Sequence, residues 1–203
     1  MSLYRKLLLP SYLDASMKKE EFERLRPSAI KGVSGTVLEI GFGSGLNLPY
    51  YENVAKLYAL DPAQELFLLA KNRIDSVSFP IEYVQASAEE IPLPDASVDF
   101  VTSTWSLCSI PDVEGALKEV HRVLKPHGKF MFIEHGKSPN KLFSFLQNML
   151  TPVSKLFAGG CHVNREIDIL ITDAGFIFEA IERFPQKRKP LIFMYRGVAI
   201  KRS

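Results

Sequence analysis

A short stretch that combines one acid with alternating glycines carries the side chains best suited to chemistry. Glu39 lies among apolar residues and is followed by Gly41, Gly43 and Gly45. The apolar residues predict a buried strand, and the glycines predict a turn at which bare backbone approaches a ligand. A carboxylate at the end of the strand repels a phosphate but accepts hydrogen bonds from an ammonium or a hydroxyl group. We therefore expect a cationic ligand at this turn.

A second acid stands after the next predicted strand. That strand covers residues 55–60, and Asp61, which is followed by Pro62, comes twenty residues after Gly41. In nucleoside-binding α/β folds, a carboxylate at this distance from the turn reaches the ribose hydroxyls. The Gly-x-Gly-x-x-Gly pattern that binds a pyrophosphate would need glycine in place of Leu46. A ribose together with a cationic amino acid group indicates S-adenosylmethionine rather than a nicotinamide dinucleotide.

Four sequence blocks, in order, resemble the class I S-adenosylmethionine-dependent methyltransferases. They span about residues 35–136 and comprise the glycine run, the Asp-Pro pair, residues 86–94 and residues 97–99. The glycine run alone is a weak signal, whereas four ordered blocks at the family's spacing are a strong one. The resemblance implies S-adenosylmethionine as the cofactor and a Rossmann-like α/β fold. Its sheet would have seven strands, with the last one inserted antiparallel, between two layers of helices.

The resemblance also implies roles for individual residues. Glu39 would accept hydrogen bonds from the methionine ammonium, the three glycines would let the backbone approach the cofactor, and Asp61 with Pro62 would hold the ribose. An Asp-Pro turn without a ligand is the alternative for this pair.

Two further loops would complete the cofactor site. Ser87, Ala88 and Glu89 would line the adenine. Many members of the family carry an acid where this chain has Ser87, so Ser87, Glu89 or the backbone would take its place. Ser103 and Trp105 would border the sulfonium, where the indole ring offers a cation–π contact of about 0.5–2 kcal/mol. The alternative is that Trp105 fills the core.

Glu134 and His135 stand at the end of the fifth predicted strand and are the candidate catalytic residues. The resemblance places this strand end on the acceptor side. His135 could take a proton from a thiol or hydroxyl near neutral pH; the alternative is that it orients a loop. A base is not obligatory, because the cofactor brings an activated methyl group and in-line positioning contributes up to about 7–11 kcal/mol.

A second cluster lies at residues 159–165. Cys161 and His162 would need further ligands at suitable spacing to hold a metal, and since none is evident we predict no metal site. Together with the acceptor-side pair, this cluster resembles a branch of small-molecule methyltransferases that includes thiol methyltransferases, with quinone and phospholipid methyltransferases as neighbours. The membrane anchor of those thiol enzymes is not expected here, because the apolar run at residues 7–9 is short and stops at Pro10.

Composition sets few limits on partners. The chain has 203 residues, 46% of them apolar, and a net charge of +2, which fits one globular domain. Its basic residues at 5–6, 18–19 and 187–189 are not interleaved with aromatic residues, so we expect no nucleic-acid partner. Cys108 and Cys161 have no CxxC spacing, which favours a reducing, cytoplasmic setting. A run of about 18 apolar residues, which could span a bilayer, is absent.

Strands alternate with helices, which predicts parallel crossovers and a doubly wound sheet. Strands are expected at residues 37–40, 55–60, 81–86, 98–103, 129–134, 176–184 and 191–200. Helices are expected at residues 46–54, 63–75, 112–124 and 166–174, with an N-terminal helix capped by Asp14 and two short amphipathic stretches hinged at Pro152. We divide the single domain into a helical lid, a cofactor-binding core, an acceptor-side insertion and a C-terminal part, at residues 1–34, 35–136, 137–164 and 165–203.

The sequence therefore predicts a methyltransferase whose acceptor is small and largely apolar, such as a thiol, a quinol or a lipid amine. The N-terminal helix and the insertion would cover the acceptor, because both are rich in Phe, Leu and Met; simple packing of the N-terminal helix on the sheet edge is the alternative. Two other functions stay open: a nicotinamide-dependent oxidoreductase and a non-catalytic module that binds S-adenosylmethionine. Contact of residues 140–157 with a membrane surface is left open, as are the acceptor atom and the oligomeric state.

Overall fold

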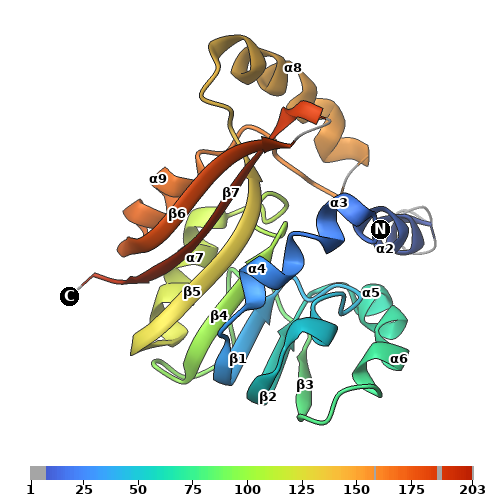
Figure 1. The fold of residues 1–203 in the computed structure, drawn as a ribbon, viewed down its shortest axis with the longest axis vertical. Coiled ribbons are helices and arrows are strands. Elements are labelled where there is room, and N and C mark those ends of the chain that lie inside the picture. Colours follow the sequence, from blue (N-terminus) through green and yellow to red (C-terminus); the bar gives the residue numbers. More distant parts are fainter. Residues whose placement is uncertain (1–7, 158, 187–188, 203) are drawn as a thin grey trace.

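One seven-stranded sheet organises the chain. The structure is a computed structural model that describes residues 8–157, 159–186 and 189–202. Across the sheet the strands follow the order β3-β2-β1-β4-β5-β7-β6 (Figure 1). Their bounds are β1 Ser34–Ile40, β2 Asn53–Leu60, β3 Ile81–Val84, β4 Val98–Thr104, β5 Leu124–Gly136, β6 Phe176–Gln186 and β7 Lys189–Lys201.

The first five strands are parallel, and β7 runs the other way. β1 pairs in parallel with β2 and β4, β2 with β3, and β4 with β5. β7 is inserted between β5 and β6 and is antiparallel to both. The predicted doubly wound sheet with an antiparallel last strand is confirmed. The carboxyl ends of β1, β2, β4 and β5 therefore meet at one edge, where such folds bind their ligands.

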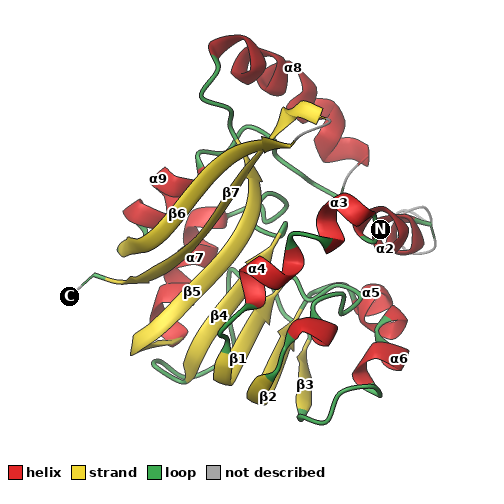
Figure 2. Cartoon of the chain, in the orientation of Figure 1, coloured by secondary structure: helices red, strands yellow, loops and turns green. Residues whose placement is uncertain are grey.

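Helices cover both faces of the sheet and complete three layers (Figure 2). α7 and α9 contact one face, and α4 contacts β4 and β5 on the other, beside η1. The bounds are α2 Leu9–Met17, α3 Glu20–Glu23, α4 Arg26–Ile30, η1 Leu48–Tyr50, α5 Gln64–Leu69, α6 Lys71–Ile74, α7 Val113–Val123, α8 Lys141–Phe157 and α9 Ile167–Asp173, with η1 a 3₁₀-helix.

Side chains of β1 alternate between the two layers. Leu38 and Ile40 belong to the apolar cluster that includes α7 and α9, whereas Val37 belongs to the cluster on the opposite face. A parallel strand that is buried on both faces needs such apolar residues on both sides. Because side chains alternate with a period of two, Glu39 points to the same face as Val37. That is the face on which α4 and η1 lie.

The N-terminal segment differs from the single helix that the sequence predicted. It forms three short helices, α2, α3 and α4. α2 begins beside Pro10, whose fixed backbone angle suits a first turn, so Asp14 lies inside the helix and is not its cap. There the Asp14 carboxylate pairs with Lys18 and Arg73.

Two predicted crossover helices are also wrong in detail. Residues 46–54 contain only the single turn η1, because β2 already begins at Asn53 and the Asn47 side chain is not used as a cap. Residues 63–75 form α5 and α6, which meet at Ala70. The backbone tightens there, since the Ala70 N–H bonds the carbonyl of Phe67, only three residues back.

The insertion forms one continuous helix, α8, in place of two stretches hinged at Pro152. The buried side chain of Gln147 fixes its middle to the sheet: the amide nitrogen donates to the carbonyls of Gly136 and Leu191, and the amide oxygen accepts from the Ser138 N–H. Gln147 thus anchors the helix five residues before Pro152, a residue that by itself favours a kink.

Two features of the sequence lie beyond what the structure describes. The basic residues at 5–6 and at 187–188 and the apolar residue Leu7 fall outside the described residues. Within residues 8–157, 159–186 and 189–202, none of the helices has the length and apolar character needed to cross a bilayer.

We predict that Asp112→Ala weakens the fold. Asp112 precedes α7, and its side chain accepts a hydrogen bond from the Gly115 N–H at 2.9 Å. Loss of such a cap lowers the free energy of unfolding by about 1 kcal/mol, which urea titration would measure. Glu114→Ala, an exposed acid in the same first turn, is the control, with a change within about 0.5 kcal/mol. Equal effects of both substitutions would contradict the capping role.

Candidate active site

Glu39 is a buried carboxylate at the carboxyl end of β1, with 1% of its surface exposed. Its two oxygens accept hydrogen bonds from the Asn47 amide and the Tyr51 hydroxyl, both at 2.8 Å. Burial raises the pKa of Glu39 to about 7, although these two hydrogen bonds act in the opposite direction. The carboxylate is thus held in position but is only half ionised near neutral pH. A nearby positive charge would favour its ionised form.

Asp61 lies at the end of the neighbouring strand. Leu60, the residue before it, pairs with Ile40 in the parallel ladder of β1 and β2. The Asp61 carboxylate accepts hydrogen bonds from the backbone N–H groups of Gly43 and Ala63, both at 2.8 Å, and burial raises its pKa. The negative charge of Asp61 contributes to the raised pKa of Glu39, so the two acids influence one another across the glycine turn.

The turn between the acids requires glycine for two separate reasons. Gly41, Gly43 and Gly45 all have positive φ, at 65°, 58° and 72°, which other residues rarely adopt. In addition, a Cβ on Gly41 would lie 2.1 Å from the hydroxyl oxygen of Ser106. The predicted bare-backbone turn is therefore present, and it brings its amides to the acidic strand ends.

Arg26 belongs to this site, although the sequence analysis did not single it out. It is 3% exposed, its guanidinium donates to the Asn47 side-chain oxygen at 2.8 Å, and it lies 5.1 Å from the centre of the Trp105 ring. Its positive charge acts on Glu39 to lower the pKa of that carboxyl. No spacing rule connects α4 with β1, so only the fold reveals this contact.

The predicted adenine loop is tied to its own neighbours. The Ser87 hydroxyl donates to Glu89 at 3.0 Å, and the other Glu89 oxygen accepts from the Asp112 N–H at 2.6 Å. Ala88 is buried in the apolar core. Glu89 thus fixes the loop to the start of α7, while Pro62 lies in the turn where Asp61 accepts its two backbone hydrogen bonds.

Trp105 stands where β4 ends, with a φ of 55°. Its ring lies edge-on to Phe22 at 4.9 Å between centroids and 6.4 Å from the His135 ring. The indole Nε1 is buried and has no hydrogen-bond partner among the described residues. α3, which carries Phe22, therefore lies over the end of β4, as a lid would.

Glu134 and His135 point to opposite sides of β5. One Glu134 oxygen accepts from the hydroxyl of Ser103 and from the Ser106 N–H at 3.0 Å, and burial raises the pKa of this carboxyl. The His135 ring lies 6.1 Å from that of Phe22, and neither of its buried nitrogens has a partner within the described chain. Of this pair, His135 is the one that stands among aromatic residues, namely Phe22 and Trp105.

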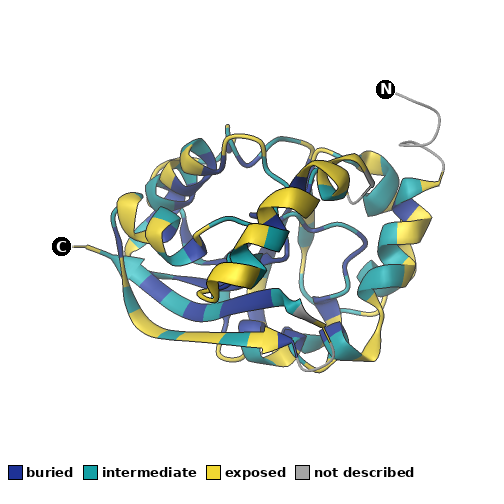
Figure 3. Cartoon of the chain, turned by 90° about the horizontal axis from the view of Figure 1, so that it is seen from above, coloured by how far each residue is buried: buried dark blue, intermediate teal, exposed yellow. Residues whose placement is uncertain are grey.

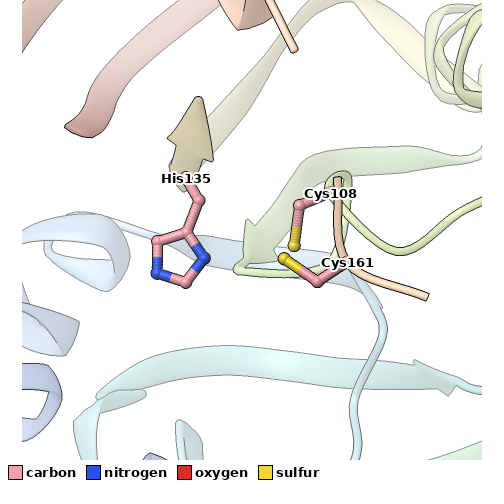
Figure 4. Close-up of side chains that lie close together, drawn as sticks. All are labelled: Cys108, His135 and Cys161. Carbon is pink, nitrogen blue, oxygen red and sulfur yellow. The ribbon is translucent and has the colours of Figure 1, made fainter. Parts of the chain in front are cut away.

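Cys108, His135 and Cys161 come together, which the sequence analysis did not foresee. Their two sulfurs and one ring nitrogen lie within 4.8 Å of one another (Figure 4). His162, which the sequence paired with Cys161, is used differently: its backbone N–H donates to the Cys108 carbonyl at 2.7 Å. Spacing along the chain offers Cys161 only the adjacent His162 as a further ligand, whereas the fold brings His135 from β5 and Cys108 from the loop after β4.

Two open hollows in the surface lie away from the strand-end acids. One, of about 540 Å³, is lined mainly by residues of β6 and β7, and the other, of about 730 Å³, by residues of α8, α9 and β7. The carboxylates of Glu39 and Asp61 are instead buried. Arg26 of α4 lies close to Glu39 through Asn47, and Phe22 of α3 lies against Trp105 at the end of β4.

Comparisons with known proteins agree with this geometry. The family model described as "Methyltransferase domain" matches residues 38–132. A human thiol S-methyltransferase, TMT1A, is 37% identical over 160 residues, which cover 75% of this chain and 64% of the human protein. The ubiquinone/menaquinone biosynthesis C-methyltransferase UbiE of Rickettsia bellii is 31% identical over 185 residues, covering 83% of this chain and 68% of that protein.

A solved structure confirms the fold. The S-adenosylmethionine-dependent methyltransferase of Aquifex aeolicus superposes with a TM-score of 0.66 at 20% identity, covering 95% of this chain and 98% of that one. The chain belongs to the class I S-adenosylmethionine-dependent methyltransferases. Its match to TMT1A spans less than two thirds of the human protein's length.

We predict that Glu39 couples cofactor binding to pH. Its pKa is about 7 in the folded protein against an ordinary value near 4.5, so most of the carboxyl is protonated at pH 6. A ligand ammonium favours the ionised form, and affinity for S-adenosylhomocysteine should rise about tenfold from pH 6 to pH 8. Calorimetry across this range measures the effect.

Glu39→Gln is the control, with weaker binding that varies little over the same range. Without ligand, the raised pKa acts on folding with this sign: the group's contribution to stability is complete below about pH 4.5 and is lost as the pH rises through about 7. Equal pH profiles for the two proteins would contradict a role for Glu39 at the ammonium.

Proposed function

We propose that the protein transfers the methyl group of S-adenosylmethionine to a small, largely apolar acceptor, and that a thiol is the best candidate. The observation that carries the proposal is the placement of Glu39 and Asp61 at neighbouring strand ends with a glycine turn between them. The names of the relatives support the acceptor class, since one acts on thiols and another on quinones.

The donor and acceptor groups of this site fit the cofactor. Glu39 would accept from its ammonium, and the Asp61 oxygens, which each accept one backbone N–H, keep lone pairs for the ribose hydroxyls. Arg26 stands beside Glu39 and would meet the carboxylate of the methionine part. Opposite charges on the protein would thus match both charges of the amino acid group.

Catalysis would rest mainly on placement. The cofactor supplies a methyl group that is already activated by its sulfonium. Trp105 would present an electron-rich face to that cation, and the buried surroundings would exclude water. Glu134 and His135 are the proposed acceptor-side residues; Glu134 would hold the loop after β4 through Ser106, and His135 would face the acceptor.

The lid and the insertion would form the acceptor side. Phe22 of α3 contacts Trp105 and lies near His135, so the wall next to the reacting groups is aromatic. Such a wall selects apolar molecules, because a polar acceptor would lose its hydrogen bonds to water there. On this basis residues 8–34 would cover the acceptor, together with residues 159–164, whose Cys161 lies beside His135.

α8 also offers an apolar surface to the outside. Seen from above, its outward side is largely exposed (Figure 3). The large apolar side chains on it are 46–65% exposed and are Leu142, Phe145, Met149, Leu150, Val153 and Leu156. Lys141 and Lys155 accompany this stripe, a pattern typical of helices that rest on anionic membranes. We therefore include contact with a membrane surface in the proposal, on its cytoplasmic side, where Cys108 and Cys161 would stay reduced.

A matched set of acceptors tests the reaction. An alkanethiol, an alkylhydroquinone and an alkylamine with the same chain length would be incubated with protein and S-adenosylmethionine, and S-adenosylhomocysteine release measured. We expect the alkanethiol to turn over fastest, because it pairs an apolar chain with a soft nucleophile. Absence of turnover with every acceptor, despite cofactor binding, would favour the non-catalytic module, and binding of NADH in its place would favour the oxidoreductase.

Asp61→Ala is the loss-of-function variant for that assay. Loss of two hydrogen bonds to a charged group, about 1.5–3 kcal/mol each, should weaken S-adenosylhomocysteine binding roughly 100-fold or more. Asp61→Asn serves if the alanine variant fails to fold, and Asp75→Ala, an exposed acid after α6, is the matched control. Unchanged cofactor affinity in a folded Asp61 variant would refute the assignment.

Membrane contact predicts a defined loss. Phe145→Glu should lower binding to vesicles of phosphatidylcholine and phosphatidylserine roughly tenfold or more, since burying such a side chain contributes about 1.5–3 kcal/mol. Co-sedimentation measures it. Asn148→Glu adds the same charge at a neighbouring exposed position outside the apolar stripe and should change binding much less. Equal losses would mean that charge, not the apolar stripe, governs the contact.

A further inference from the structure

Three side chains that are distant in sequence converge on one buried point. Cys108 lies in the loop after β4, His135 at the end of β5 and Cys161 after α8. Figure 4 shows the two sulfurs facing each other, with the imidazole ring of His135 directed toward them. All three ligand atoms lie within 4.8 Å of one another, and both cysteines are free thiols.

The loops that carry the two cysteines are tied together by hydrogen bonds to the backbone carbonyls around Cys108. The Cys108 carbonyl accepts from the His162 N–H at 2.7 Å, and it lies 3.1 Å from the Nδ1 atom of that residue. Arg165 donates to the carbonyl of Leu107 and, at 2.7 Å, to that of Ile110. The approach of the two sulfurs is therefore built into the fold and not left to side-chain rotation.

The histidine supplies an independent reason to expect a ligand. Both ring nitrogens of His135 are buried, and in the described part of the chain neither has a hydrogen-bond partner. A buried polar atom without a partner is unfavourable, and a bound ion would supply a partner for one of the two nitrogens. The neighbouring aromatic rings of Phe22 and Trp105 cannot replace it.

The two thiols are also unequal. The pKa of Cys161 is lowered because the Cys108 thiol donates a hydrogen bond to it, and the pKa of Cys108 is raised by the same contact and by burial. The two sulfurs and the imidazole together form a ligand set that suits a soft divalent cation.

We propose that Cys108, His135 and Cys161 bind one Zn²⁺ ion and leave its fourth position open. Zinc takes thiolate and imidazole ligands in a tetrahedron, with ligand atoms about 3.5–3.8 Å apart, and the three atoms need only close slightly to reach this. Two sulfurs and a nitrogen exclude magnesium and calcium, which prefer oxygen. Three protein ligands and an open position are the arrangement of a catalytic zinc site.

The open position deepens the proposed function and rests on it. It would lie on the acceptor side, because His135 stands next to Trp105 and Phe22. A thiol acceptor would bind there as a thiolate, releasing its proton to solvent. Its sulfur then forms the bond to the methyl carbon while the carbon–sulfur bond of the sulfonium breaks, and that electron pair stays on the cofactor sulfur. Anion and cation become two neutral thioethers, so charge balances. His135 would serve as a ligand, not as a base.

Cobalt binding tests the metal site directly. The full chain would be reduced, treated with chelator and titrated with Co²⁺, followed by Zn²⁺. We expect one equivalent of Co²⁺ with a thiolate-to-cobalt charge-transfer band and the visible bands of a tetrahedral ion, displaced by Zn²⁺. The band should disappear in Cys161→Ser and in His135→Gln. His127→Gln, an exposed histidine near the start of β5 and outside the cluster, should keep it.

A folding control and three contrary results make the cobalt experiment decisive. S-adenosylhomocysteine binding by calorimetry shows that each variant is folded and has its cofactor site, independently of the metal. A missing thiolate band in the reduced wild-type protein, or a band that survives Cys161→Ser, overturns the zinc site even if methyl transfer is observed. A Cys108–Cys161 disulfide that re-forms in preference to metal binding overturns it as well.

The acceptor role has its own test. Turnover of the alkanethiol should be lost on removal of Zn²⁺ and return when it is restored, while S-adenosylhomocysteine affinity stays the same. Equal turnover with and without the metal overturns the acceptor role of the open position. If the wild-type protein did not bind S-adenosylhomocysteine at all, the proposed function would be refuted. The cobalt band would still report on the metal site in that case.

Discussion

The site depends on the burial of two carboxylates at neighbouring strand ends. Removing negative charge from water costs several kcal/mol per ion unless hydrogen bonds or opposite charges compensate. Asn47 and Tyr51 compensate Glu39, and backbone amides compensate Asp61, but only in part, because the pKa of each acid remains raised. A cationic ligand whose hydroxyl groups donate hydrogen bonds would complete the compensation, and for this reason we propose that the cofactor binds at this edge of the sheet.

The rest of the fold keeps that arrangement in place. The parallel pairing of β1 with β2 fixes the distance between the acids, and the positive φ angles of the glycine turn allow the chain to cross between them. Polar residues of the N-terminal helices then close over the acids, while apolar residues of the same helices close over the ends of β4 and β5. One short segment thus separates a charged side from an apolar side, which in our proposal receive the cofactor and the acceptor.

The sequence predicts the sheet well because its signals are local. These signals are apolar runs, alternating glycines and the acids at two strand ends, and each extends over only a few residues. The parallel topology follows from the alternation of strands and helices. The pairing of Arg26 with Asn47 and the convergence of Cys108 on Cys161 join segments with no common pattern, so only the fold reveals them. Residues 46–54 resemble a helix in sequence because Asn47 is a residue type typical of an N-cap, whereas its side chain bonds Arg26 and Glu39.

A crystal structure of the protein with S-adenosylhomocysteine tests the central claim most directly. The account predicts the ammonium within hydrogen-bond distance of Glu39 and both ribose hydroxyls on Asp61, with the thioether sulfur facing Trp105. A nucleoside bound elsewhere, or one that leaves either carboxylate without contact to it, would contradict the account.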